Sequence, residues 1–217
     1  MFGSTIPRQR LGRRIGLAVK RGMDIAVSVL LLVLLSPVLL VASLLVLAGL
    51  GRPIFFRQRR PGLYGRPFNL CKFRTMRAGD LPDTDRTTRL GNFIRSCSLD
   101  ELPQLWNVLR GDMSLVGPRP LLMQYLPRYS PEQARRHEMR PGMTGWAQVN
   151  GRNRVAWNER FRLDVWYVDR WSLPLDFKIL ILTGARVLSR SGIREPGEAT
   201  MSEFMGNDRP PRATDGV

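Results

Sequence analysis

Two adjacent carboxylates, Asp100 and Glu101, are the side chains whose type and spacing point most directly to chemistry. They open the segment SLDELPQLWNVLRGD, in which the leucines and Trp106 recur at helical spacing. Acidic residues in the first turn of a helix act structurally, as caps and as favourable charges beside the helix dipole. A carboxylate in the same place is also a competent nucleophile toward phosphorus when cations neutralise the phosphate. Both interpretations stay open at this point.

Cations that suit phosphate lie near this acidic pair in the sequence. Arg95 precedes it, and Arg119 follows it in a Gly-Pro-Arg-Pro loop whose proline rings stiffen the backbone. A guanidinium binds phosphate through a planar, bidentate fork, although an arginine-rich chain also carries many arginines on its surface. Lys72 either points toward the carboxylates or touches lipid head groups. The two arginines are therefore candidate phosphate ligands.

The scarcity of other reactive side chains narrows the chemistry. The chain has two cysteines, Cys71 and Cys97, and one histidine, His137. These are too few for a disulfide scaffold or for a Cys/His zinc site. Two carboxylates without His or Cys suit Mg²⁺, which prefers oxygen ligands and commonly bridges a protein carboxylate and a substrate phosphate. His137 lies in a charged helical segment and is expected to be a solvated surface residue.

The N-terminal part of the chain has the composition of a membrane element. Residues 1–79 hold 14 basic residues and one acid, Asp24, in a chain whose formal net charge is +16. Residues 25–51 form an uncharged stretch of 27 positions rich in Leu, Val and Ile. As a helix it would reach roughly 40 Å, more than the ~30 Å hydrocarbon core of a bilayer. Ser36-Pro37 near its middle predicts a kink or break, because proline lacks the N–H group and clashes with the preceding turn.

The charge distribution favours a helix that enters the bilayer and returns to the same side. Basic clusters lie on both sides of the apolar stretch, and such clusters stay in the cytoplasm. A kinked single span would send one cluster outward, and a cleaved signal peptide would have a shorter apolar core. The sequence therefore predicts a re-entrant helix broken at Ser36-Pro37. The basic flanks predict contact with anionic membrane lipids, and no nucleic acid is expected as a partner.

The remaining residues predict an α+β, mostly helical fold with a compact domain. Pro103 is tolerated only in the first positions of a helix, which places the N-cap of the helix that carries the acidic pair at Leu99 or Asp100. The segments SLVGPRPL and RPGMTGWAQVNGRN are expected to be loops, since Gly and Pro recur in both. Other expected elements are a β-hairpin at residues 52–76, a loop at 78–88, a short helix or irregular segment at 90–98, and helices at about 131–139, 155–171 and 174–189.

The helix expected at 155–171 carries Trp157, Phe161 and Trp166 near one side, and the helix at 174–189 follows it. Aromatic side chains favour the membrane interface, so these amphipathic helices are expected either to lie on the bilayer or to pack on protein. From residue 191 onward Gly, Pro, Glu and Asp dominate, which predicts a disordered tail.

Five motifs follow one another between about residue 20 and residue 189: RGMDIAVSVLLLVLLSPVLL, RPIFFRQRRPG, KFRTM, SLDELPQLWNVLRGDMSLVGPRP and RPGMTGWAQVNGRN. In these motifs and their order the chain resembles the small monotopic phosphoglycosyl transferases, the bacterial sugar transferases that initiate exopolysaccharide, O-antigen and related glycan synthesis. The resemblance implies transfer of a sugar 1-phosphate from a nucleoside diphosphate sugar, usually a UDP-sugar, to undecaprenyl phosphate, a polyprenyl phosphate. It also implies a re-entrant helix broken at Ser-Pro.

The same resemblance implies roles for individual residues. Asp100 would attack the β-phosphate and form a phosphosugar-enzyme intermediate, with Mg²⁺ as the cofactor held at Asp100. Glu101 would assist the polyprenyl phosphate or the metal. The residues that match substrate-binding positions of the family are Arg95, Arg119, Lys72 and Pro118.

These observations predict four segments and a place in the cell. The segments are a basic N-terminal segment (1–22), a re-entrant membrane helix (23–51), a catalytic sugar transferase domain (52–190) and the tail (191–217). The expected location is the cytoplasmic face of the bacterial inner membrane. Two alternatives remain: a non-catalytic, membrane-anchored basic scaffold for glycan assembly, and an enzyme that transfers the sugar phosphate directly without a covalent step.

Overall fold

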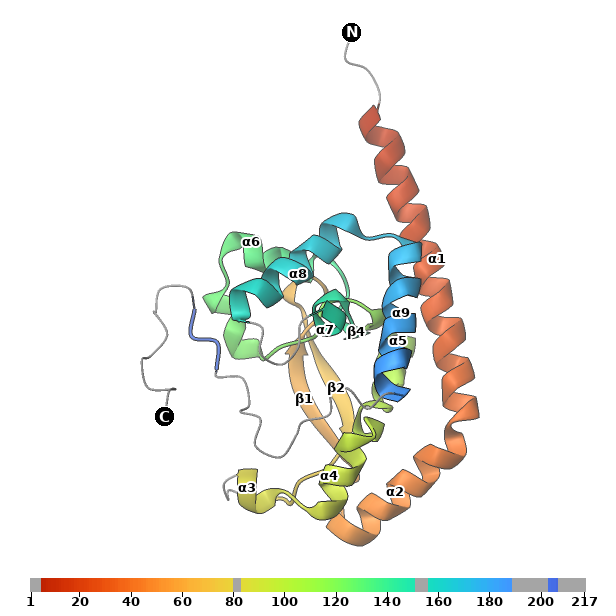
Figure 1. The fold of residues 1–217 in the computed structure, drawn as a ribbon, viewed down its shortest axis with the longest axis vertical. Helices are drawn as coiled ribbons and strands as arrows, with labels where there is room; N and C mark the ends of the chain where they lie inside the picture. The colour runs from red at the N-terminus through yellow and green to blue at the C-terminus, as the bar shows by residue number, and fades with distance from the viewer. Residues whose placement is uncertain (1–4, 80–82, 151–155, 189–202, 207–217) are drawn as a thin grey trace.

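The computed structural model describes residues 5–79, 83–150, 156–188 and 203–206, with side chains of the first helix from residue 11 onward. The fold is α+β and mostly helical, as predicted, with two small two-stranded sheets. Figure 1 shows the long helix α1 (Thr5–Leu34) along one side of the domain, and α2 (Ser36–Leu50) leaving its end at an angle. The other α-helices among the described residues are α3 (Asp83–Arg86), α4 (Arg89–Ser96), α5 (Gln104–Arg110), α6 (Pro131–Ala134), α7 (Trp146–Asn150), α8 (Trp157–Arg170) and α9 (Leu173–Leu188).

The break between α1 and α2 lies where the sequence predicts it. The two helices meet at Leu35, with Pro37 among the first residues of α2, and their axes differ in direction by 64°. Proline is harmless there because the first N–H groups of a helix have no helical partner. Within the described residues, no single helix is long and apolar enough to cross a bilayer, whereas the bent pair formed by residues 11–34 and α2 meets both conditions together.

The bent helix pair exposes an apolar surface that the domain does not cover. Leu30 and Val33 of α1 are 63% and 69% exposed, and Leu40 of α2 is 62% exposed. Exposed apolar surface of this extent marks an interaction site, because burying it elsewhere would be favourable. The large apolar side chains exposed on this part of the pair are Ile25, Val29, Leu30, Val33, Leu34, Val38, Leu40, Val41, Leu44, Leu45 and Leu47.

Several of the predicted lipid-facing charges instead hold the domain together. Lys20 of α1 is buried and donates a hydrogen bond to Asp176 of α9 at 2.6 Å. Arg21 donates to the carbonyls of Val108 and Leu109, at 2.5 and 2.8 Å, where α5 ends. The last carbonyls of a helix lack helical donors, so a guanidinium there satisfies them and favours the helix dipole. This part of the basic flank therefore serves the fold rather than lipid.

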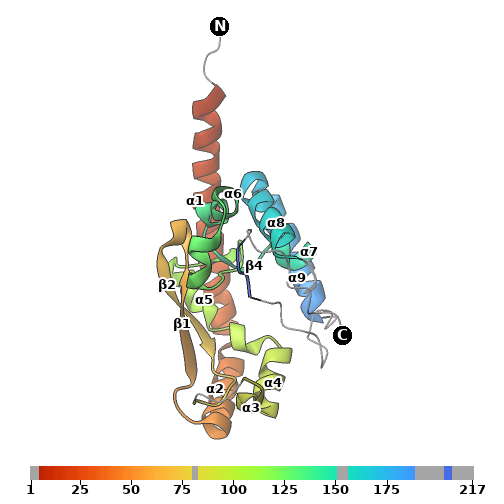
Figure 2. The same ribbon diagram turned by 90° about the vertical axis from the view of Figure 1, so that its left-hand side faces the viewer.

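The predicted β-hairpin is confirmed. Strands β1 (Phe55–Pro61) and β2 (Pro67–Phe73) pair antiparallel, with Phe56 opposite Lys72. The turn between them is a 3-10 turn, η1 (Leu63–Gly65), in which Tyr64 has φ +54°. Figure 2 shows the hairpin on one side of the domain and α8 and α9 on the other. The hairpin thus presents one face, including Lys72, toward the interior.

The expected loop at 78–88 is only partly a loop. Residues 80–82 lie outside the described residues, but α3 forms directly after them, and Met76 and Thr87 make an isolated antiparallel bridge. The sequence there lacks any periodicity that would have predicted these elements. The next segment, expected as a short helix or irregular at 90–98, is helical over α4, with the Thr88 side chain accepting a hydrogen bond from the Gly91 N–H at 3.0 Å.

The two expected glycine-rich loops contain strands that pair with each other. Strand β3 (Ser114–Val116) lies parallel to β4 (Gly142–Thr144). Gly117 follows β3, and a Cβ there would lie 2.3 Å from the carbonyl oxygen of Arg140, so only glycine allows this approach. Parallel pairing between segments far apart in sequence has no local signal, which explains why a loop was predicted for each.

The expected helix at 131–139 is shorter and changes type. It begins with a capping box, in which the Ser130 side chain accepts from the Gln133 N–H at 3.2 Å. After α6 the chain continues as a 3-10 turn, η4 (Arg135–Glu138). This turn buries His137 against Tyr129, with ring centroids 5.5 Å apart. The prediction of a solvated His137 is therefore wrong: burial lowers the pKa of its imidazole to about 4, which keeps it neutral.

Candidate active site

The predicted acidic pair sits on a tight turn rather than in the first turn of an α-helix. Residues Leu99–Glu101 form a 3-10 turn, η2, and α5 begins only at Gln104, after Pro103. Pro103 has no N–H and cannot make a helical hydrogen bond, so α-helical bonding starts after it. The predicted N-cap at Leu99 or Asp100 is therefore wrong by several residues. Ser98, directly before this turn, has φ +55°, a region that non-glycine residues seldom occupy.

Glu101 is bound by two of the cations singled out from the sequence, Lys72 and Arg119. Lys72 Nζ and Arg119 Nη2 each donate a hydrogen bond to Glu101 Oε1 at 2.6 Å. Burial alone would raise the pKa of Glu101, but the charges and hydrogen bonds of Arg119 and Lys72 outweigh it and lower the pKa from 4.5 to about 2. Glu101 is therefore an anion at any physiological pH. The charge of Glu101 in turn raises the pKa of Arg119.

Asp100 lies beside this cluster but does not share its hydrogen bonds. Its nearest cationic atom is Lys72 Nζ, 3.7 Å from Oδ2, and the residue is 9% exposed. Burial raises the pKa of the Asp100 carboxyl above its usual value, and the charge of Glu101 adds to this, while Lys72, Arg119 and Arg95 oppose it. The environments thus push the pKa values of two adjacent carboxylates apart, which is typical of acids with different roles in one site. A carboxylate has about four lone-pair positions, so Asp100 can still interact with an incoming group.

Arg95 lies at the end of α4 and faces the same site. Its positive charge is among those that lower the pKa of Asp100. Its Nε and Nη2 atoms are buried, and in the described part of the chain they have no hydrogen-bond partner. Buried donors without a partner are costly, and an anionic ligand would satisfy them. The structure therefore brings together Asp100, Glu101, Lys72, Arg95 and Arg119, as the sequence predicts.

Pro118 has a backbone role in this arrangement. Its carbonyl oxygen accepts a hydrogen bond from the Gly142 N–H at 3.0 Å, which fixes the loop after β3 to β4. The same loop carries Arg119. Direct contact of Pro118 with substrate stays a prediction.

Two arginines near Arg119 were not singled out from the sequence. Arg60 of β1 donates to the Pro120 carbonyl at 3.5 Å, and burial together with the charge of Arg119 lowers its pKa. Arg136 is buried and donates to the Arg119 carbonyl at 2.8 Å and to Asp164 Oδ2 at 2.7 Å. Period-two alternation in the hairpin puts Arg60 and Lys72 on the same face, which was a usable signal for Arg60. Arg136 carried no such signal.

The carboxylate set suits a single magnesium ion held jointly with substrate. Mg²⁺ binds proteins through one or two carboxylates and fills its shell with water and phosphate oxygens. Asp100 offers such an oxygen, whereas Glu101 Oε1 is occupied by Lys72 and Arg119. Throughout the described ranges, no group of three or more His, Cys, Asp or Glu gathers to make an all-protein metal site. The site therefore fits a metal that arrives with phosphate.

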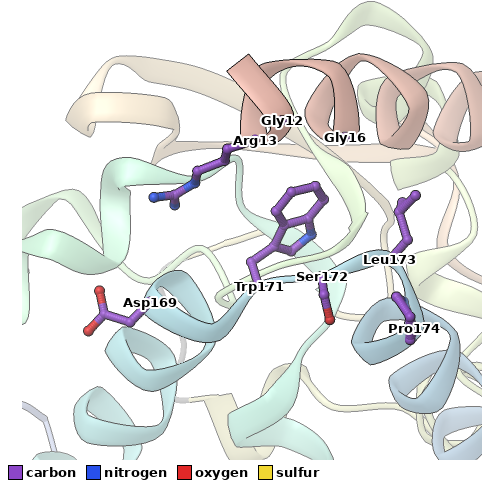
Figure 3. Close-up of a pocket in the computed structure, with 8 residues that line it drawn as sticks. All are labelled: Gly12, Arg13, Gly16, Asp169, Trp171, Ser172, Leu173 and Pro174. Carbon is purple, nitrogen blue, oxygen red and sulfur yellow. The ribbon is translucent and has the colours of Figure 1, made fainter. Parts of the chain in front are cut away.

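Of two recesses formed by the described residues, one adjoins the acidic pair and the other does not. A pocket of about 410 Å³ lies between α1 and the junction of α8 with α9 (Figure 3) and contains none of the predicted site residues. A second recess of about 310 Å³ is entirely apolar, lies between α2 and α4, and includes Leu99, the neighbour of Asp100. Its lining residues are Pro37, Val38, Val41, Ala42, Leu45, Phe93, Ile94 and Leu99.

Comparisons with known proteins find similarity to bacterial sugar transferases. The model of the family described as bacterial sugar transferase matches residues 15–190. An uncharacterized sugar transferase, EpsL, of Bacillus subtilis is 52% identical over 195 residues, which cover 87% of this chain and 96% of that protein. A UDP-glucose:undecaprenyl-phosphate glucose-1-phosphate transferase of Caulobacter vibrioides is 42% identical over 203 residues, covering 86% of this chain and 74% of that protein.

A more distant relative differs in its sugar and in its length. An undecaprenyl-phosphate galactose phosphotransferase of Salmonella typhimurium is 38% identical over 208 residues, covering 85% of this chain. The match spans only 44% of that protein. Relatives that resemble this chain to a similar degree are thus named for glucose and for galactose.

Proposed function

Because the chain belongs to the bacterial sugar transferase family, we propose that it transfers a sugar 1-phosphate from a UDP-sugar to undecaprenyl phosphate, releasing UMP and initiating a bacterial glycan such as an exopolysaccharide. The observation that carries this proposal is that two adjacent carboxylates have different environments and pKa values shifted in opposite directions. Glu101 is held by Lys72 and Arg119, while Asp100 beside it has a raised pKa and its Oδ2 lies 3.7 Å from Lys72 Nζ. The names of the relatives support the lipid acceptor.

The proposed reaction has two displacements at one phosphorus atom. A carboxylate oxygen of Asp100 attacks the β-phosphorus of the UDP-sugar, a new O–P bond forms, and the bond to the bridging oxygen breaks, so that UMP leaves with that oxygen. A phosphate oxygen of the polyprenyl phosphate then attacks the same phosphorus and releases the Asp100 carboxylate. Arg95 and Arg119 bind the phosphate oxygens and offset their charge. When bound, Mg²⁺ would supply further positive charge at the diphosphate.

Glu101 has a positioning role in this scheme. It holds Lys72 and Arg119 in place through its Oε1 atom. Both cations then lie beside Asp100 before substrate arrives, so little reorganisation is needed during the reaction. With a pKa of about 2 it does not take up a proton from the acceptor at neutral pH.

A membrane location fits both the substrate and the exposed surface. We propose that the apolar face of α1 and α2 enters the cytoplasmic leaflet of the inner membrane and returns, and that α8 and α9 lie near its surface. The apolar recess beside Leu99 adjoins this face and suits the first isoprene units of the acceptor. Asp100 would then lie close to the depth of lipid phosphates, where the acceptor phosphate is held.

The topology of the bent helix pair is testable by labelling. A cysteine added at either terminus, in a variant lacking Cys71 and Cys97, is expected to resist a membrane-impermeant thiol reagent in intact cells and to react after lysis. The reason is that both basic flanks stay on the cytoplasmic side. A periplasmic cysteine in a known membrane protein is the positive control. External labelling of one terminus would establish a kinked single span instead.

The pH dependence of the rate tests the electrostatics of Asp100. The attacking carboxylate must be ionised, so kcat/KM is expected to fall as the pH drops through the raised pKa of Asp100. Lys72 lowers that pKa, so Lys72→Met is expected to move this acid limb to higher pH. Lys178→Met, on α9, is the matched control and should leave the limb in place. An unchanged acid limb in Lys72→Met contradicts the assignment.

The direct test of the function is an assay of the purified full chain in nanodiscs with undecaprenyl phosphate, Mg²⁺ and a panel of UDP-sugars. We expect UMP release and a lipid diphosphate sugar with at least one donor, and loss of both on addition of a chelator. A membrane-anchored scaffold for glycan assembly would release no UMP with any donor. The panel also identifies the sugar, which the named relatives leave open between glucose and galactose.

A further inference from the structure

A short piece of the C-terminal tail packs on the domain although the tail composition predicts disorder. Residues 203–206, here called the tail segment, are described, whereas 189–202 and 207–217 lie outside the described residues. Figure 1 draws the segment in blue beside the green elements that follow β3. Phe204 in this segment is only 3% exposed. A buried phenylalanine beside an exposed methionine, Met205, indicates a specific docking contact.

Phe204 completes a cluster of aromatic rings. Its ring centroid lies 4.9 Å from that of Phe161 and 5.7 to 5.8 Å from those of Tyr125, Tyr129 and Trp157. Phe161 and Tyr125 are themselves 1% and 5% exposed. These rings belong to α8, to the 3-10 turn η3 (Met123–Arg128) and to Tyr129, which follows it. Without Phe204, part of this apolar surface would face water.

Polar contacts fix the tail segment beside the aromatic cluster. Glu203 Oε1 accepts hydrogen bonds from Gln124 Nε2 at 2.6 Å and from Arg128 Nη1 at 2.8 Å. Arg128 Nη1 also donates to the carbonyl oxygen of Phe204. The segment is therefore held by a side chain, a main-chain group and a buried ring at once, which sets its position and direction.

The aromatic cluster adjoins the residue that holds the backbone of Arg119. The guanidinium of Arg136 lies over the rings of Tyr129 and Phe161, at 5.8 and 5.6 Å from their centroids. Arg136 donates to the Arg119 carbonyl oxygen, and Arg119 in turn binds Glu101 at 2.6 Å. A continuous set of contacts thus connects Phe204, through Phe161 and Arg136, to Arg119 and Glu101.

We propose that the tail segment is a positioning element for donor binding: Phe204, docked in the aromatic cluster, holds Arg136 and through it the Arg119 loop in the geometry that binds the UDP-sugar. This rests on the proposed function for the identity of the ligand. Phe204 touches none of the proposed reacting groups, so it is a positioning residue and not a catalytic one. Its loss should weaken donor binding more than it slows the chemical step.

The test compares Phe204→Ala with Met205→Ala, the adjacent residue in the same segment. Met205 is 48% exposed, and its Sδ lies 3.8 Å from Arg128 Nη1. It is the matched control because it belongs to the same segment but adds no ring to the aromatic cluster. Phe204→Ala is expected to raise the KM for the accepted UDP-sugar and the dissociation constant for UDP about tenfold, with kcat changed less than about twofold. Met205→Ala should leave all three values within about twofold. Phe204→Tyr, which keeps the ring, is expected to restore most of the affinity.

A peptide added in trans separates positioning from folding. A synthetic peptide of residues 199–210 is expected to restore the KM of a variant truncated after residue 198, whereas the same peptide with Phe204→Ala should not. Unchanged KM and UDP affinity in Phe204→Ala would overturn the inference. A fall in kcat of about tenfold without a change in KM would overturn it too. If the unmodified chain binds UDP but releases no UMP with any donor, the proposed function fails, and the UDP titrations still decide the role of the tail segment.

Discussion

Asp100→Asn is expected to lower sugar phosphate transfer by about 10³- to 10⁶-fold, the range seen when a covalent nucleophile is removed. The amide has nearly the same shape but lacks the anionic oxygen that attacks phosphorus. The substitution also removes a buried carboxylate whose pKa is raised, so the folded state should tolerate it. The measurement is UMP release and lipid-linked product in nanodiscs, with circular dichroism to confirm folding.

The covalent step has its own readout. Incubation with the UDP-sugar alone is expected to add the mass of one sugar phosphate to the unmodified protein and nothing to Asp100→Asn. The matched control is Asp169→Asn, which makes the same change at a surface carboxylate paired with Arg135. Full transfer by Asp100→Asn would remove the nucleophile assignment. Transfer by the unmodified chain without any adduct, together with loss in the variant, would favour direct transfer.

Asp176→Ala is expected to destabilise the protein by about 3–5 kcal/mol, the cost of breaking a buried ion pair. Asp176 accepts hydrogen bonds from Lys20 Nζ at 2.6 Å, Tyr167 Oη at 2.6 Å and Trp171 Nε1 at 3.1 Å. The two charged side chains are each 7% exposed. Removing the carboxylate leaves the Lys20 ammonium buried without its counter-charge. Denaturant unfolding in micelles, followed by tryptophan fluorescence, measures the change.

A double variant distinguishes the buried charge from simple loss of packing. Lys20→Met combined with Asp176→Leu removes both charges and keeps apolar volume, so it is expected to be more stable than Asp176→Ala alone. Asp169→Ala, at an exposed carboxylate, should change the free energy of unfolding by less than about 1 kcal/mol. A double variant as unstable as the single one would show that the charge pair is not the dominant interaction.

The parts of the structure that could be predicted from the sequence depend on local physical chemistry. Pro37 breaks a helix wherever it stands in the interior, and period-two alternation around Lys72 requires a strand. The acidic pair and Arg119 were identified as candidates because a carboxylate can attack phosphorus and a guanidinium between two prolines can bind phosphate. We expected cations to lie close to the acidic pair, because a phosphate site needs positive charge beside the carboxylates. The 2.6 Å contacts of Lys72 and Arg119 with Glu101 confirm this proximity.

The parts that could not be predicted depend on contacts between distant segments. His137 looked solvated because its neighbours in sequence are charged, but η4 turns it against Tyr129. Lys20 looked like a lipid contact, but its partner is 156 residues away. The burial of Phe204 likewise needs rings from η3 and α8, which no local pattern joins to the tail. Even the start of α5 was misplaced, because Pro103 allows a 3-10 turn before it.

Because α1 is one continuous helix, its length sets how its exposed apolar face is oriented relative to the domain. Lys20, Arg21 and Asp24 bind the domain on one face, and farther along the same unbroken helix Leu30 and Val33 are exposed on another. Each added residue rotates the remainder of the helix by about 100° and advances it by about 1.5 Å. A single insertion between Asp24 and Leu30 would therefore turn the exposed apolar face about 100° away from its present direction relative to the domain, and α2 would turn with it. Only insertions or deletions close to a whole turn, three or four residues, keep the domain-facing and exposed faces of α1 in their present relative orientation. Each such change would move the bend at Leu35 by about one helical turn along the axis of α1.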